Sequence, residues 1–233
     1  MIELRPYNEL GGAQHGWLDT RHHFSFADYY DPKRMSWGHL RVWNDDSIAA
    51  HSGFPAHPHR DMEIITYVRT GAITHEDNLG NRGRTEAGDV QVMSAGTGIA
   101  HSEMNEEDVT TQIFQIWIMP NEKGLPPAWG TKPFPKGKRS GSFVTLASGL
   151  PDDTEDALPI RANARLVAAT LKAGQSTEYH IAAGRKVYLV PASGRIDING
   201  VLAAAGDGVA ISDERLLTVS AQEDSEIVLV DVA

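Results

Sequence analysis

The chain carries GFPAHPHRDMEIITYVRTG from Gly53 to Gly71 and AGDVQVMSAGTGIAHSEMN from Ala87 to Asn105, and these two segments decide its fold. The first contains His57-Pro58-His59 and the second contains His101-Ser102-Glu103, so each has two metal-capable side chains at positions i and i+2. On a β-strand these two positions point to the same face. Two neighbouring strands of this kind would direct three imidazoles and one carboxylate into one pocket, a ligand set that suits iron, manganese, nickel, copper or zinc.

The composition limits the functions that the chain can have. Its 233 residues suffice for one large domain or two small ones, and 21 Lys and Arg against 31 Asp and Glu give a net charge of −10. Such a surface repels phosphate backbones, so we expect no direct binding of nucleic acid. The absence of cysteine excludes disulfides, thiolate metal sites and cysteine nucleophiles, which leaves nitrogen and oxygen as metal ligands.

No segment of the sequence is typical of a membrane protein. The opening residues MIELRPYNEL contain no apolar signal core, and no run of about 18 apolar residues occurs in the chain. We therefore expect a cytoplasmic protein with no membrane partner.

Residues 47 to 120 alternate short β-like runs with turns. Ile64 to Val68 (IITYV) and Gln112 to Met119 (QIFQIWIM) are β-branched and aromatic, and Asn78 to Gly83 is typical of a hairpin tip. Many short strands with glycine-rich turns favour an antiparallel barrel or jelly roll. Earlier in the chain, His23 to Phe26 alternates and is a candidate strand with one face toward the pocket.

A change of composition marks the end of this region. Five of the 12 prolines lie between Pro120 and Pro135, and proline does not donate to a strand ladder. We therefore predict an N-terminal metal-binding domain at 1–120, a linker at 121–141 and a C-terminal domain at 142–233.

The C-terminal domain repeats the pattern of the first without its metal ligands. Ala205-Gly206-Asp207 echoes Ala87-Gly88-Asp89, which indicates a second barrel of the same kind, and Asn199-Gly200 predicts a hairpin turn. No histidine follows where His101 would fall, so we expect this barrel to bind no metal. Periodicity leaves open whether ARLVAATLKA (164–173) is a strand or a helix.

Four separated motifs resemble those of the pirin family, and the two central ones resemble the motifs of the cupin superfamily. In chain order they are HGWLDTRHHFSFADYYDP (His15 to Pro32), HPHRDMEIITY (His57 to Tyr67), SAGTGIAHSE (Ser94 to Glu103) and QIWI (Gln115 to Ile118). The resemblance implies an all-β bicupin fold, that is, two tandem jelly-roll-like barrels with few short helices, of which the C-terminal one is degenerate.

The same resemblance implies one mononuclear divalent metal, expected to be Fe(II), with Mn, Ni, Cu, Co and Zn as alternatives. The implied ligands are His57, His59, His101 and Glu103. The general cupin pattern takes its carboxylate from the first motif, where Glu63 stands, so Glu63 is the competing ligand. We favour Glu103 because its spacing from His101 puts both side chains on one face of a strand.

Two functions follow from this interpretation. The first is that of a quercetin 2,3-dioxygenase, in which a flavonol and O2 react at the open positions of the metal and Glu103 is the catalytic residue that accepts the hydroxyl proton. The alternative is a regulatory or redox-sensing protein that binds a protein partner, with quercetinase activity incidental. In both cases we expect a monomer, because two barrels in one chain supply the contacts of a cupin dimer.

Overall fold

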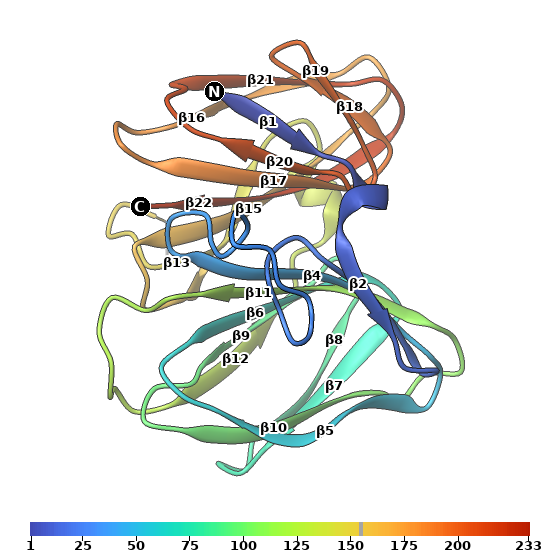
Figure 1. The fold of residues 1–233 in the computed structure, drawn as a ribbon, viewed down its shortest axis with the longest axis vertical. Helices are drawn as coiled ribbons and strands as arrows, with labels where there is room; N and C mark the ends of the chain where they lie inside the picture. Colours follow the sequence, from blue (N-terminus) through green and yellow to red (C-terminus); the bar gives the residue numbers. More distant parts are fainter. Residues whose placement is uncertain (154–155) are drawn as a thin grey trace.

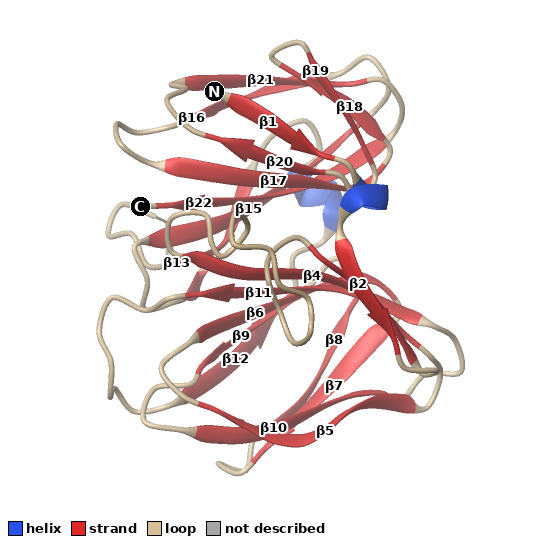
Figure 2. Ribbon diagram, in the orientation of Figure 1, coloured by secondary structure: helices blue, strands red, loops and turns tan. Residues whose placement is uncertain are grey.

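The computed structural model describes residues 1–153 and 156–233 and confirms an all-β protein built from two barrels (Figure 1). Figure 2 shows strands throughout both barrels. Within the described ranges the only helices are two short 3-10 turns, η1 (Tyr7–Glu9) and η2 (Lys136–Arg139). None of the helices in these ranges is long and apolar enough to cross a membrane.

The N-terminal barrel consists of two antiparallel sheets. The larger sheet has the strand order β12 (Ala128–Lys132), β9 (Val90–Ser94), β6 (Glu63–Thr70), β11 (Thr111–Ile118), β4 (Leu40–Ile48), β3 (Leu18–His22), β2 (Gly11–Gln14). The smaller sheet has the order β5 (Ser52–His59), β10 (Ile99–Asn105), β7 (Ala72–Asp77), β8 (Arg82–Glu86). The two histidine motifs therefore lie on neighbouring strands, β5 and β10, as their spacing predicts.

The C-terminal barrel repeats this strand order. Its larger sheet runs β1 (Ile2–Arg5), β20 (Gly208–Ile211), β17 (Lys186–Ser193), β22 (Ser225–Val232), β15 (Ala164–Leu171), β13 (Val144–Ser148), β14 (Leu158–Pro159). Its smaller sheet runs β16 (Ser176–His180), β21 (Leu216–Ala221), β18 (Arg195–Ile198), β19 (Val201–Ala204). Strands β5, β10, β7 and β8 thus correspond to β16, β21, β18 and β19.

Two strands cross the predicted domain boundaries. Strand β1 lies in the predicted N-terminal domain but pairs with β20 of the C-terminal barrel, and β12 lies in the predicted linker but pairs with β9. Each occupies an edge of its larger sheet. An edge strand tolerates flanking prolines, here Pro127 and Pro133, so the proline-rich composition did not reveal β12. The boundaries of the domains stay a prediction.

The local predictions have mixed outcomes. Asn199-Gly200 joins β18 to β19 with φ of 49° and 90°, which is the left-handed pair that a tight hairpin needs. The ambiguous segment 164–173 contains strand β15. Residues 23–26 are not a strand, because the chain turns at Ala27, which has a φ of 48° and follows a single bridge from Phe26 to Tyr29.

The largest apolar core lies between the barrels. It joins Trp43 and Phe114 of the N-terminal barrel to Tyr188 and Val230 of the C-terminal barrel, all fully buried. The ring centroids of Trp43 and Tyr188 are 5.7 Å apart, so aromatic contacts cross the interface directly. The outward faces of the two larger sheets are therefore covered by each other, and only their inward faces are available for a site.

Candidate metal centre

The three predicted histidines meet at one end of the N-terminal barrel. His57 on β5 is the register partner of His101 on β10, and His59 is the partner of Ile99. Nitrogens of all three imidazoles lie within 4.8 Å of one another, and the Nε2 atoms of His57 and His101 are 3.1 Å apart. Two nitrogens bound about 2.1 Å from one metal at a right angle lie about 3.0 Å apart, so this spacing fits a shared ion.

Hydrogen bonds to the other ring nitrogens assign the tautomers of two of these histidines. Nδ1 of His57 lies 2.7 Å from the carbonyl oxygen of Pro55, so this nitrogen carries the proton and donates it. Nε2 of His57 is then an unprotonated acceptor directed at the cluster.

A chain of hydrogen bonds through Asp77 and His75 assigns the tautomer of His101 in the same way. Nε2 of His75 donates to Asp77 at 2.9 Å, which leaves Nδ1 of His75 as the acceptor for Nδ1 of His101 at 3.2 Å. Stacking on Trp129, with ring planes 9° apart, holds the His75 ring in place. Nε2 of His101 is therefore also unprotonated, and two lone pairs face each other across 3.1 Å. A cation between them removes this repulsion, so the donor set fits a metal.

The electrostatic surroundings keep the imidazoles of His59 and His101 neutral. Burial, together with the neighbouring imidazoles, lowers the pKa of His101 to about 3 and the pKa of His59 to about 4. Metal binding requires the neutral form of histidine, and the folded chain supplies it at neutral pH without the cost of removing a proton.

Glu103 lies in the same barrel but is held by polar side chains. It is buried, and its Oε1 accepts hydrogen bonds from the Thr66 hydroxyl at 2.8 Å and from Gln91 Nε2 at 2.7 Å, while Oε2 accepts one from Gln115 Nε2 at 2.6 Å. Among the described residues, no Lys or Arg forms an ion pair with Glu103. A buried carboxylate without a cationic partner also fits a nearby metal ion.

The structure places Glu103 on the predicted face but outside the histidine cluster. The burial of β10 alternates so that His101 and Glu103 both point inward, as the i, i+2 argument requires. The β5–β10 register shifts between these two residues, which makes Phe54 the partner of Glu103. Ligation by Glu103 therefore stays a prediction.

The competing carboxylate, Glu63, lies elsewhere. Its Oε2 accepts hydrogen bonds from the Ser94 hydroxyl at 2.7 Å and from the backbone amide of Arg161 at 3.0 Å. Arg161 belongs to the C-terminal half of the chain, so Glu63 tethers the two barrels.

Sequence reasoning missed the residues that hold Glu103. Thr66, Gln91 and Gln115 lie in β6, β9 and β11 respectively, each is flanked on both sides by apolar or aromatic residues, and all three are buried. A polar residue between two apolar neighbours of a buried strand is the signal that could have found them, because it must meet a hydrogen-bond partner.

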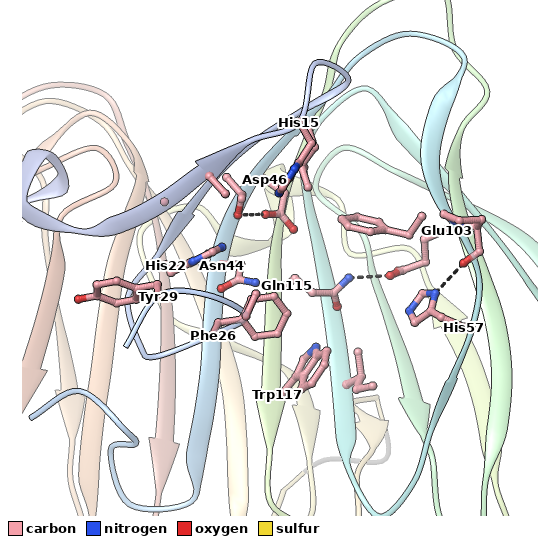
Figure 3. A pocket seen from close by; sticks show the side chains of 18 of the residues that line it. His15, His22, Phe26, Tyr29, Asn44, Asp46, His57, Glu103, Gln115 and Trp117 are labelled. Atoms are coloured by element: carbon pink, nitrogen blue, oxygen red, sulfur yellow. Dashed lines mark hydrogen bonds between the residues drawn. The ribbon is translucent and has the colours of Figure 1, made fainter. Parts of the chain in front are cut away.

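A cavity of about 700 Å³ opens beside the histidines (Figure 3). Its walls include five aromatic side chains, Trp17, Phe26, Tyr29, Phe54 and Trp117. The predicted ligands His57, His59, His101 and Glu103 all line it. The site therefore combines a metal-capable donor set with room for a planar organic molecule.

Comparison with known proteins identifies relatives over the full length of the chain. The family model described as pirin matches residues 3–118, and that of the quercetinase C-terminal cupin domain matches residues 145–232. PA1210 of Pseudomonas aeruginosa is 69% identical over 233 residues, covering 100% of both chains. A protein of Escherichia coli named quercetin 2,3-dioxygenase is 44% identical over 233 residues, covering 100% of this chain and 99% of its own.

Solved structures agree with this relationship. The crystal structure of the bacterial pirin YhhW of Escherichia coli in complex with nickel(II) superimposes with a TM-score of 0.93 at 43% identity, covering 100% of this chain and 99% of that one. The chain therefore belongs to the pirin family, with a pirin domain and a C-terminal cupin domain.

Proposed function

We propose that this protein is a metal-dependent quercetin 2,3-dioxygenase, which opens the central ring of a flavonol with O2. The observation that carries the proposal is the aromatic-lined cavity of about 700 Å³ beside the three histidines. Cavities of about 300–1,000 Å³ with apolar walls and a few polar groups are typical of sites for drug-sized ligands, and a flavonol is a ligand of this class. The name of the Escherichia coli relative supports the same activity.

The proposed metal ligands are His57, His59 and His101, with Glu103 as the fourth. Fe(II) is the proposed metal, and the nickel(II) in the related bacterial pirin supports a site that accepts other divalent ions as well.

The chain's own residues would bind and orient the substrate. A bound divalent ion would lower the pKa of the flavonol hydroxyl and hold its anion beside O2. Glu103 accepts the hydroxyl proton, and the amides of Gln91 and Gln115 keep its carboxylate in place. Phe26 and Trp117, whose rings meet edge to face at 5.4 Å, limit the plane in which the flavonol can lie.

The overall reaction is balanced by O2 alone. Both oxygen atoms of O2 enter the ester product, at the two ring carbons beside the carbon that bears the hydroxyl. That carbon leaves with its own oxygen as carbon monoxide, and the proton held by Glu103 returns to the product. The protein supplies orientation and a dry pocket, while the metal and the electron-rich flavonol supply the reactivity.

We further propose a monomer with domains at 1–120 and 142–233. The apolar core between the barrels lies within one chain and already covers the outward faces of both larger sheets.

The test is a side-by-side assay of metal-free and Fe(II)-loaded protein, prepared without air. Quercetin is added, air is admitted, and the loss of flavonol absorbance and the release of carbon monoxide are followed. We expect turnover only in the loaded protein. One metal per chain without flavonol loss would contradict the proposal and favour a regulatory role.

A further inference from the structure

Three polar side chains line the cavity away from the histidine cluster, and the proposed chemistry uses none of them. His22 on β3 is the register partner of Asn44 on β4, and Asp46 follows on the same face of β4. All three line the cavity. Figure 3 shows them on the opposite side from His57 and Glu103, with Gln115 between.

Two polar atoms at this end lack hydrogen-bond partners. Oδ1 of Asn44 and Nδ1 of His22 are buried and have no partner among the residues that the structure describes. The two side chains are 4% and 2% exposed. Buried polar atoms are nearly always hydrogen-bonded, so two unpartnered atoms on residues that line one cavity point to a ligand that completes them.

Asp46 adds a carboxyl group to the same end. The Thr20 hydroxyl donates a hydrogen bond to Oδ1 of Asp46, which is 2% exposed. Burial raises the pKa of Asp46 to about 7, so both its protonated and its ionised form are accessible near neutral pH. It can therefore accept a hydrogen bond from a ligand hydroxyl or donate one to it.

The spacing of the strands relates this end to the histidine end. Glu103 is hydrogen-bonded to Gln115 on β11, and β4 and β3 are the next two strands in the sheet. Adjacent strands lie about 4.8 Å apart, so Asn44 and His22 are roughly 5 and 10 Å beyond Gln115. A ligand anchored at the histidines reaches them only if it is an extended ring system.

We propose that His22, Asn44 and Asp46 form a second subsite, which binds a phenolic hydroxyl of the substrate remote from the hydroxyl at the metal. The side-chain amide of Asn44 forms a hydrogen bond with that hydroxyl, and the imidazole of His22 supplies a second polar group beside it. The inference rests on the proposed function, which gives the class of substrate. It adds that the protein prefers a flavonol with several hydroxyl groups over one that carries only the metal-binding hydroxyl.

The test compares two ligands by equilibrium binding, so it needs no turnover. Binding of quercetin and of 3-hydroxyflavone, which lacks every hydroxyl except the one for the metal, is measured by calorimetry on nickel(II)-loaded protein without air. The variant is Asn44→Val, because the corresponding strand position in the C-terminal barrel is Val167, which shows that valine fits this place in the fold. Ser47→Ala, also on β4 but outside the cavity wall, is the control.

We expect the wild-type protein and Ser47→Ala to prefer quercetin by about tenfold or more, as one buried hydrogen bond implies. In Asn44→Val the preference should fall to about twofold or less, with the affinity for 3-hydroxyflavone unchanged. Equal affinities in the wild type, or an undiminished preference in Asn44→Val, would overturn the subsite while leaving the dioxygenase proposal intact. If neither flavonol binds to the metal-loaded protein, both proposals fail.

Discussion

The two barrels share a strand order but differ in what their interiors contain. One register row crosses five strands of the larger N-terminal sheet and is polar throughout: Gln91, Thr66, Gln115, Asn44 and His22. The corresponding row of the C-terminal sheet is Val209, Leu189, Leu229, Val167 and Thr145. The N-terminal row faces the cavity and the carboxylate of Glu103. Four residues of the C-terminal row, by contrast, belong to a continuous apolar core.

The smaller sheets differ in the same way. Glu103 pairs with His75, the fourth residue after Gly71, and Val219 pairs with Ile198, the fourth residue after Gly194, so Val219 occupies the place of Glu103. Leu217, two residues before Val219, occupies the place of His101. The comparison teaches that the filled C-terminal barrel and the core between the barrels stabilise the molecule, which allows the N-terminal interior to remain polar and open.

The largest expected effect comes from replacing a histidine of the cluster with an apolar residue. His101→Val removes one of three clustered imidazoles, and we expect bound metal to fall from one per chain to below about a tenth, with loss of turnover. Elemental analysis after dialysis measures this. The exposed His180 on β16 provides the control, because His180→Val should keep its metal. Full metal content in His101→Val would show that the cluster is not the site.

Replacing the carboxylate should have the next largest effect. Glu103→Gln keeps the three histidines but removes the base, and its new NH2 group must face the amide of Gln91 or Gln115. We expect partial metal content and a fall in turnover of about 10²–10⁴-fold. Steady-state kinetics with quercetin measures this, with Glu106→Gln at the surface as the control. Unchanged turnover would make Glu103 dispensable.

Breaking the polar row should have a smaller effect. Gln115→Leu introduces the residue found at the corresponding position, Leu229, and leaves Oε2 of Glu103 without its 2.6 Å hydrogen bond. We expect metal affinity to weaken by roughly 10–100-fold, as for other residues that orient a metal ligand. Competition with a chelator measures the affinity, and Gln112→Leu on the same strand is the control. An unaltered affinity would argue that the row does not support the site.

The smallest effect concerns the dependence of stability on pH. Burial raises the pKa of Asp46 from 3.8 to about 7 in the folded protein. At pH values between these two, folding is therefore coupled to the uptake of a proton by Asp46. Its stabilising contribution is complete below about pH 4 and is lost as the pH rises through about 7. Asp46→Asn should therefore gain thermal stability relative to the wild type between pH 5 and pH 8, by roughly 5–10 °C. Scanning calorimetry of the metal-free proteins checks this. A difference in melting temperature between variant and wild type that stays constant from pH 5 to pH 8 would contradict it.

The sequence predicted those features that lie within single motifs. The spacing of His57, His59 and His101 predicted two paired strands and one cluster, and the repeated Ala-Gly-Asp turn predicted the second barrel. The polar row escaped prediction because its members come from five separate strands, and only the register of the folded sheet brings them together. Strand β1 escaped for the same reason, since its partner, β20, lies about two hundred residues along the chain.

The central claim is that one metal binds in the N-terminal barrel and none in the C-terminal barrel. Anomalous diffraction from crystals of Fe(II)-loaded protein tests this directly. We predict one peak per chain, about 2.1 Å from a nitrogen of each of His57, His59 and His101, with an oxygen of Glu103 as the fourth ligand. A peak away from these histidines, or a second peak inside the C-terminal barrel, would contradict the account.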